Sequence, residues 1–192
     1  LTGPLNAIVS LCEPLLALDT PPIERLLRAR VACIAGSAWL LQRRIERSRE
    51  ALREALACLV EEDAWRAMAL CSLGELELLA GGPPAAQRLL EEALKVATCS
   101  KDVRQQCRAL NALGALAAQE ARWEDASHHY QAGLDRATAD RLIRWQGLLL
   151  GNLGMVQHQI GNLDAAANHY KLSVALAEQA GDRRGEGDRR CN

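Results

Sequence analysis

Apolar residues recur along most of the chain at the three- and four-residue spacing that places them on one face of an α-helix. Short turns separate these stretches, such as Gly161-Asn162 and the run 81–84, in which proline stands near a helix start where its missing N–H costs little. Short turns between helices indicate antiparallel neighbours. The pattern predicts an all-α fold with helices over about 4–18, 23–43, 46–60, 63–80, 84–99, 102–120, 123–138, 140–160 and 163–180, and the start of another near 183. Pro14 is expected to kink or break the first helix.

The helical pattern repeats with a period of 40 residues. A leucine, a second leucine and a glycine recur in the first helix of each copy, and the sets end at Gly74, Gly114 and Gly154. The second helix repeats a small residue and a large one four positions later: Ala86 and Leu90, Ala126 and Tyr130, Ala166 and Tyr170. An earlier, weaker copy has Gly36, Ser48 and Leu52 in these positions and lies 38 residues before the next. We call Gly36, Gly74, Gly114 and Gly154 the repeat glycines.

A glycine in the middle of a helix costs about 1 kcal/mol relative to alanine, so a packing gain must offset it. We expect the repeat glycines to lie against the alanines of the partner helix, so that the two backbones approach closely. The large residues Leu90, Tyr130 and Tyr170 are expected to fill the space between successive hairpins. Because one hairpin cannot bury its apolar face alone, the hairpins should stack into an α-solenoid.

The copies divide the chain into six segments. They are a lone N-terminal helix at 1–22, which fits the second helix of an upstream copy, a degenerate repeat at 23–62, repeats at 63–101, 102–139 and 140–182, and the start of a truncated repeat at 183–192. Asn192 lies 40 residues after Asn152, so the chain is expected to stop inside a copy. The last hairpin should then leave Leu163, Tyr170 and Val174 partly exposed, and we expect the fragment to self-associate through them.

These residues resemble the tetratricopeptide signature, W-x-x-L-G followed by A-x-x-x-F, from about residue 24 to the end. Two positions depart from it: Leu70, Leu110 and Leu150 replace the tryptophan, and Thr98, Thr138 and Glu178 replace the proline that ends the second helix. Without that proline both helices can gain extra turns. The 40-residue period is similar to the longer-repeat branch of the family, which includes polarity scaffolds, kinesin light chains and the regulatory arrays of bacterial signalling ATPases and transcription activators. The resemblance implies a right-handed superhelix of hairpins.

In this family the first helix of each hairpin lines a concave groove. The resemblance implies groove-facing positions three before, and one, four and five after, the repeat glycine. The candidate site that follows is Glu75, Asn111, Ala115, Gln119, Met155, His158 and Gln159, with Asn152 where family members often place an asparagine that binds a peptide backbone. Cys33, Leu40 and Cys71 occupy groove-facing positions of the earlier copies. The alternative is that these are ordinary positions that tolerate small residues. A carboxylate clamp is not predicted, because only Arg30 and Arg108 lie nearby.

Composition narrows the choice of partner and compartment. The formal net charge is −1, whereas nucleic-acid binders usually carry a basic excess, so no nucleic-acid partner is expected. No apolar run is long enough to span a bilayer, and no membrane partner is expected. The seven cysteines include no CxxC pair, and we expect reduced thiols in a cytoplasmic protein with no metal or other cofactor. The bias of the basic residues toward arginine suggests a bacterial source.

No nucleophilic triad or phosphate loop can be assembled from the sequence, so an enzyme is not predicted. His129 and His169 share one repeat position and are expected at the surface or between hairpins. Trp65 and Trp145 also share a position; packing in the longer helices is the preferred interpretation, and an exposed ligand platform is the alternative.

The sequence therefore predicts a protein-interaction scaffold that binds a peptide or helix in a concave groove. We expect it to be the sensor or regulatory arm of a larger bacterial signalling or transcription-regulating protein. The alternative is a repeat array that senses a small effector. An RNA-reading repeat is disfavoured by the missing positive charge.

Overall fold

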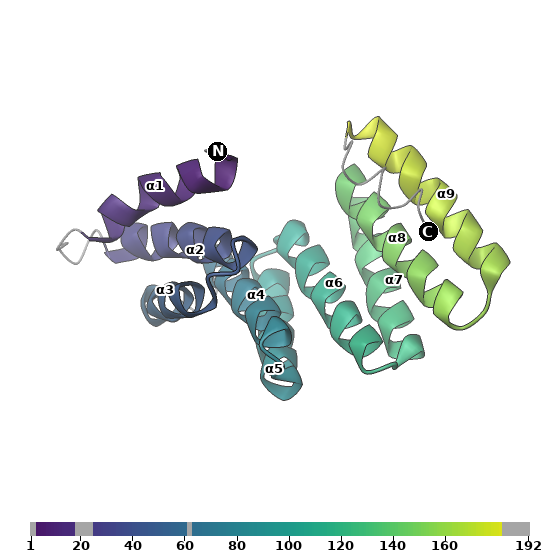
Figure 1. Ribbon diagram of the computed structural model, residues 1–192, viewed down its shortest axis with the longest axis horizontal. Helices are drawn as coiled ribbons and strands as arrows, with labels where there is room; N and C mark the ends of the chain where they lie inside the picture. Colours follow the sequence, from purple (N-terminus) through teal and green to yellow (C-terminus); the bar gives the residue numbers. More distant parts are fainter. Residues whose placement is uncertain (1–2, 18–24, 61–62, 182–192) are drawn as a thin grey trace. The chain divides into compact units, whose positions relative to one another are not determined.

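The computed structural model describes residues 3–17, 25–60 and 63–181, and these residues form helices joined by turns (Figure 1). The helices are α1 (Pro4–Leu16), α2 (Arg25–Leu41), α3 (Ile45–Cys58), α4 (Ala64–Leu79), α5 (Pro83–Cys99), α6 (Val103–Gln119), α7 (Trp123–Ala139), α8 (Ile143–Gln159) and α9 (Leu163–Gln179). No strand occurs in the described residues. The predicted all-α class is confirmed, and the predicted helix near 183 lies outside the described residues.

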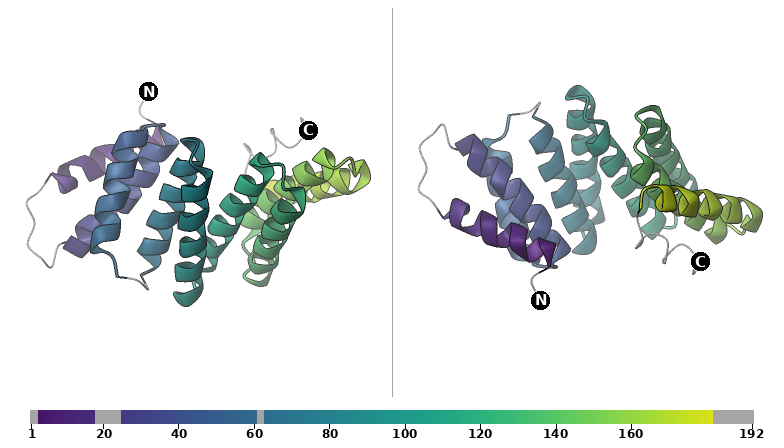
Figure 2. Two further views of the ribbon diagram at one scale, coloured as in Figure 1. Left: turned by 90° about the horizontal axis from the view of Figure 1, so that it is seen from below. Right: turned by 90° about the horizontal axis from the view of Figure 1, so that it is seen from above.

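The chain divides into two compact units, Leu1–Gln105 and Gln106–Asn192. In the first unit α1 packs on α2, and two antiparallel hairpins follow, α2 with α3 and α4 with α5 (Figure 2). The second unit holds most of α6, then α7, and the α8–α9 hairpin, with α7 packed against α8. The paired helices of each unit form the helical hairpins of an α-solenoid, as the repeat predicts.

The repeat glycines lie against the large residue of the partner helix in the same hairpin. A Cβ atom on Gly114 would lie 2.5 Å from Cε1 of Tyr130, and one on Gly154 would lie 2.8 Å from Cδ1 of Tyr170. Leu52 and Leu90 approach Gly36 and Gly74 in the same way, at 2.7 Å. These large residues therefore occupy the space opposite the repeat glycine within each hairpin. That they also fill the space between successive hairpins stays a prediction.

A second close contact holds each hairpin together, and the sequence analysis did not identify it. The residue seven positions before the repeat glycine is small and buried in every copy: Ala29, Ala67, Cys107 and Gly147. In the α8–α9 hairpin the Ser173 hydroxyl donates a hydrogen bond to the Gly147 carbonyl at 2.5 Å. In the preceding hairpin the Cys107 thiol donates to the Gly133 carbonyl, with a sulfur–oxygen distance of 3.6 Å. Because side chains this small let the backbones approach, they extend the contact by about two helical turns.

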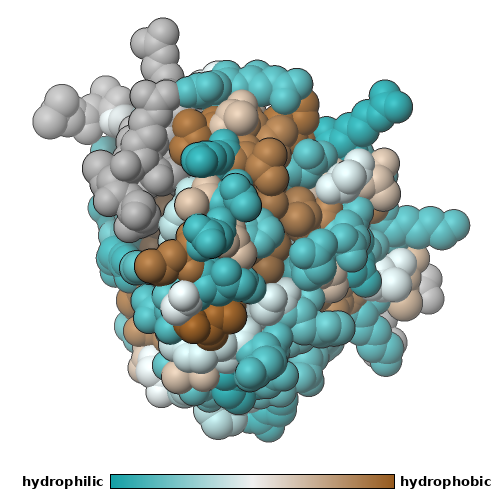
Figure 3. Space-filling view, turned by 90° about the vertical axis from the view of Figure 1, so that its right-hand side faces the viewer, coloured by the Kyte–Doolittle hydropathy of each residue, from teal (hydrophilic) through white to brown (hydrophobic). Residues whose placement is uncertain are grey.

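The last described helix, α9, is more exposed than α7 at corresponding repeat positions. Trp123 of α7 is half-buried, whereas Leu163, at the same repeat position on α9, is 61% exposed. Tyr170 and Val174 are half-buried. Figure 3 views the α8–α9 side of the protein and shows apolar side chains at the surface between polar ones. The partial exposure of these residues agrees with the expectation, and self-association through them stays a prediction.

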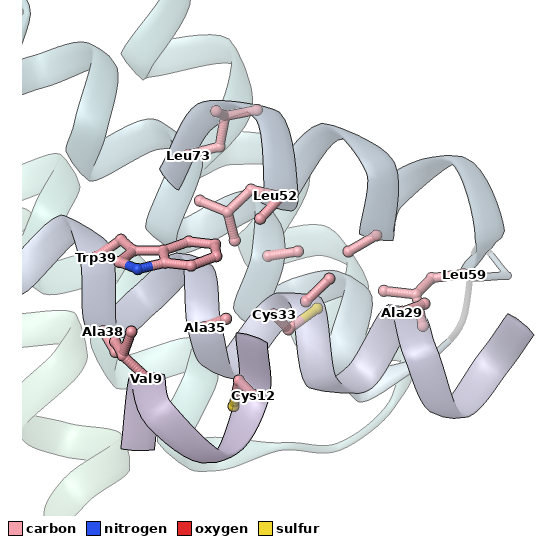
Figure 4. Close-up of a cluster of buried hydrophobic side chains, with 14 residues drawn as sticks. Val9, Cys12, Ala29, Cys33, Ala35, Ala38, Trp39, Leu52, Leu59 and Leu73 are labelled. Atoms are coloured by element: carbon pink, nitrogen blue, oxygen red, sulfur yellow. The ribbon is translucent and has the colours of Figure 1, made fainter. Parts of the chain in front are cut away.

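The core of the first unit includes residues of α1, α2, α3 and α4 (Figure 4). Trp39 is only 7% exposed and shares this core with Leu52 and with Val9 of α1. The helix α1 continues through Pro14 and ends two residues later at Leu16, so the expected break does not occur at the proline. Because Pro14 lies in the last turn, its missing N–H affects only the end of the helix.

We expect Gly114→Ala to lower the free energy of unfolding by about 1–3 kcal/mol, because the new Cβ would meet the buried, rigid ring of Tyr130. Gly147→Ala is the matched control. Its Cβ would make only ordinary contacts, 3.4 Å to the Ser173 carbonyl oxygen and 3.5 Å to Leu176 Cβ, and alanine is the better helix former by up to about 1 kcal/mol. Urea unfolding of both variants would measure the difference. Equal stabilities would contradict the assigned glycine–tyrosine contact.

We expect Ala126→Leu to destabilise the protein by about 1–3 kcal/mol, because Ala126 is 0% exposed and a larger side chain would overpack the helix interface. Glu124→Leu on the exposed side of the same helix should change the melting temperature little. Thermal unfolding followed by circular dichroism would compare them. A wild-type melting temperature for Ala126→Leu would refute its place at a close helix contact.

Candidate functional site

In the second unit the predicted groove residues lie on two first helices, α6 and α8. Asn111, Ala115 and Gln119 follow one another along α6 at helical spacing, and their side chains range from half-buried to exposed. Asn152, Met155, His158 and Gln159 occupy α8, where Asn152 and Met155 are half-buried and the other two are exposed. All seven side chains are therefore at least partly accessible, as a binding surface requires.

A hydrogen bond joins the two asparagines of this surface. The Asn152 Nδ2 amide donates to Asn111 Oδ1 at 2.6 Å, across 41 residues of sequence. An asparagine side chain offers two N–H donors and a carbonyl acceptor, so the pair retains further hydrogen-bonding capacity. In particular, Asn111 Nδ2 and Asn152 Oδ1 lie outside this bond. The structure thus places an amide donor and an amide acceptor on neighbouring helices.

Most side chains around the asparagine pair are neutral and partly apolar, and the half-buried Arg108 lies one turn before Asn111 on α6. Ala115 and Met155 lie one turn further along α6 and α8, and Gln119 and Gln159 follow at the helix ends. Leu148 adds an apolar group with 37% exposure, seven residues before Met155 and so on the same face of α8. The sequence analysis missed Leu148, although its spacing of two turns from Met155 is a signal that could have found it.

In the first unit only some of the predicted groove-facing positions are accessible. Glu75 on α4 is half-buried, and Leu41 and Leu79 are exposed by 68% and 49%. Ser37, next to the repeat glycine of α2, is joined to Ser72 of α4 by a hydrogen bond of 2.8 Å.

Three groove-facing expectations are wrong in this unit. Cys33 and Cys71 are 0% exposed, and Leu40 is 5% exposed. The Cys33 thiol points at α4, where it donates to the Trp65 carbonyl at a sulfur–oxygen distance of 3.7 Å. These residues belong to the contacts between helices and cannot line a binding surface.

The buried cysteines are poor nucleophiles. Burial raises the pKa of Cys33 to about 12 and that of Cys107 to about 11, so both stay protonated thiols. Cys58 and Cys99 are exposed near the ends of α3 and α5, and none of the six cysteines in the described residues forms a disulfide. Within the described residues, no group of three or more histidine, cysteine, aspartate or glutamate side chains could hold a metal ion. None of the described helices is both long and apolar enough to traverse a bilayer.

The paired tryptophans and histidines are only partly accessible. Trp65 is half-buried against the core of the first unit, and the guanidinium carbon of Arg30 lies 5.9 Å from the centre of its ring. Trp145 is half-buried as well. For Trp65 the packing interpretation therefore describes the structure better than an exposed platform. His129 and His169 are half-buried, in agreement with a position at the surface or between hairpins.

Comparison with known proteins identifies the fold. No protein-family model matches the sequence, and no curated protein matches it. Among solved structures, aspartyl phosphate phosphatase F from Bacillus subtilis matches 95% of this chain and 48% of its own, with a TM-score of 0.81 and 14% identity. A signal transduction ATPase with a tetratricopeptide repeat sensor, from Pyrococcus horikoshii, matches 97% of this chain and 29% of its own, with a TM-score of 0.77 and 12% identity. YrrB, a tetratricopeptide protein with an unusual peptide-binding site, matches 98% and 84%, with a TM-score of 0.58 and 14% identity.

These likenesses show a tetratricopeptide-type array of helical hairpins, as the repeat predicts. The chain spans about half the length of the phosphatase and less than a third of the ATPase. At such low identity the likeness extends to the fold alone.

We expect the stability of the protein to fall as the pH drops below about 6.5, in part because of His169. Burial lowers the pKa of His169, and its Nδ1 atom is buried without a hydrogen-bond partner in the described residues. Above neutral pH the histidine is uncharged in both folded and unfolded chains and contributes no pH dependence. At lower pH the unfolded chain takes up the proton first, so the folded state loses relative stability.

Urea unfolding between about pH 8 and pH 5.5 would measure this effect in wild type and in His169→Gln. The variant should lose less stability over this range. His128→Gln is the control, since His128 is exposed on α7, and it should keep the wild-type pH dependence. Identical profiles for His169→Gln and wild type would contradict the assigned role.

Proposed function

We propose that the α6–α8 surface binds a peptide or helix of another protein, largely through the peptide's main chain. The hydrogen bond between Asn152 and Asn111 is the observation that supports this proposal. A peptide group presents one C=O acceptor and one N–H donor, which matches the donor on Asn111 Nδ2 and the acceptor on Asn152 Oδ1. The bond within the pair also limits the rotation of both amides, so less side-chain entropy is lost on binding.

The neighbouring side chains fit a neutral ligand segment. Leu148, Ala115 and Met155 offer apolar contact, and Gln119 and Gln159 add uncharged hydrogen-bonding groups. Main-chain recognition of this kind supplies affinity, while apolar contacts select among side chains. Because the asparagine pair is half-buried on helix faces and not enclosed, it suits a peptide better than a small effector held in a closed pocket.

We further propose that the chain serves as the sensor or regulatory arm of a larger signalling protein, and that it acts by binding and not by catalysis. The support is the likeness of fold to an ATPase whose repeat region is described as a sensor, and to a repeat protein described as having a peptide-binding site. In such an arrangement, occupancy of the α6–α8 surface would change the contacts available to the rest of the protein.

Panning a displayed library of random dodecapeptides against the protein would test the binding proposal. Peptides that bind at the α6–α8 surface should lose between about twofold and tenfold in affinity on Asn111→Ala or Asn152→Ala, the worth of a typical hydrogen bond. The loss of binding free energy in the double variant should be smaller than the sum of the losses in the two single variants, because the two hydrogen-bonded side chains act as one unit. Isothermal titration calorimetry would give the affinities.

Asn168→Ala is the matched control, since Asn168 is exposed on α9, and it should bind like wild type. Methylating one main-chain nitrogen at a time in a selected peptide should abolish binding at one position, because the methyl group removes the N–H donor. If no selected peptide loses affinity in either asparagine variant, or if no single methylation weakens binding, main-chain recognition by the pair is refuted.

A further inference from the structure

A hollow of about 440 Å³ lies between α7 and α8 in the second unit. Its apolar lining comes from Trp123, Val156 and Ile160, and Ile160 is 52% exposed. Polar side chains complete the lining: Glu124, Ser127, His128, Gln131 and Gln157. The hollow shares no residue with the asparagine surface, so its use is independent of the proposed function.

An ion pair spans the corresponding junction of the first unit, and a hollow of about 390 Å³ is lined by residues 44–47 at the start of α3. Arg49 of α3 occupies the repeat position of Ser127, and Glu77 of α4 occupies that of Gln157. Arg49 Nε lies 3.0 Å from Glu77 Oε1, and both side chains are at most 18% exposed. Arg49 also forms an ion pair with Glu46. Glu124 of α7 occupies the repeat position of Glu46.

At the α7–α8 junction the two pairing residues are shorter or uncharged, and two of the three apolar lining residues are larger, while Val156 replaces Leu76. Trp123 replaces Ile45, and Ile160 replaces Ala80, at the same repeat positions. These substitutions give the hollow a more apolar and less charged lining than that of the hollow beside Ile45 and Glu46 in the first unit. An indole and an exposed isoleucine in a depression form the kind of surface that an apolar side chain of a partner fills.

The charges around the hollow define the partner further. Residues 120–136 contain four carboxylates and two guanidinium groups, a net charge of −2, and Arg136 donates hydrogen bonds to Gln106 Oε1 and the Ala132 carbonyl. The guanidinium of Arg122 pairs with Glu120 and Asp125, which leaves Glu124 at the rim and Asp135 one turn beyond Gln131. The α8 rim, from Val156 to Gly161, adds no lysine, arginine, aspartate or glutamate. Such a field attracts basic segments and repels nucleic acids and anionic membranes.

We infer that the α7–α8 hollow is a second protein-binding site, for a peptide segment that inserts a large aliphatic or aromatic side chain flanked by lysine or arginine. The apolar side chain packs on Trp123 and Ile160. The neighbouring cation lies near Glu124, where the interaction also guides encounter between the two molecules. Two distinct surfaces on one unit would let the chain hold two segments at once.

The test uses the same dodecapeptide library, with counter-selection against the double variant Ser127→Arg, Gln157→Glu. This variant copies the ion pair of the first unit and leaves the net charge of the protein unchanged, so it fills the hollow without altering the long-range field. Peptides retained by wild type and not by the double variant should share a large apolar residue beside lysine or arginine. Their affinity should fall by about tenfold or more in the double variant, the worth of burying one large side chain.

Glu124→Gln tests the charge separately, and should weaken these peptides at low salt while leaving those of the asparagine surface unaffected. Asn152→Ala should weaken the peptides of the asparagine surface and leave those of the hollow unaffected, so the two variants distinguish the two sites. Circular dichroism would establish that each variant remains folded. If the double variant retains all peptides that wild type binds, or if the peptides that it loses carry acidic residues in place of basic ones, the second site is refuted.

Discussion

Each hairpin of this protein depends on the fit between a repeat glycine and the large residue opposite it. No side chain larger than hydrogen fits at Gly114 unless Tyr130 moves, since a Cβ would lie 2.5 Å from the ring. The glycine costs about 1 kcal/mol of helix propensity, whereas burying a large apolar side chain contributes about 1.5–3 kcal/mol. Tyr130 is only 1% exposed, so burial exceeds the cost. The small residues one to two turns away, such as Gly147 and Ser173, also pack the two helices together, although a Cβ at Gly147 would fit.

The tight packing within a hairpin buries one side of each helix against its partner. The residues on the outward faces can therefore differ between copies. On α6 and α8 the outward face carries amides and small apolar groups, and the asparagine pair gives it directional hydrogen bonding. Between α7 and α8 the outward face carries an indole and an isoleucine under an acidic rim. The first surface suits a main chain and the second suits a basic, apolar segment, because one presents hydrogen-bonding groups and the other presents apolar area with charge.

The helices and their pairing could be predicted from the sequence, because the glycine period and the short turns report directly on hairpins. The predicted neighbour Ala86 does lie beside Gly74, at 3.5 Å from its carbonyl oxygen to a Cβ on the glycine, but the closer contact with the large residue could not be predicted. Periodicity indicates the face of a helix on which a residue lies, but it does not indicate how far one helix is shifted along its neighbour. Asn111 lies three residues before its repeat glycine and Asn152 lies two before, so their contact joins different repeat positions. The burial of Cys33 under the Trp65 carbonyl has the same cause.

The positions that differ between copies are therefore the ones that indicate function in such an array. Positions that every copy fills alike, such as the repeat glycine, hold the hairpin and report only on the fold. The position held by Arg49 in one copy and by Ser127 in another is different, because the fold is compatible with either. Where an ion pair spans a junction, charged groups occupy the surface. Where short neutral residues stand in their place, Trp123 and Ile160 keep apolar area in contact with water at a cost of roughly 25 cal/mol per Å². A binding partner that covers this area removes the cost, which is why the departure from the repeat is the informative feature.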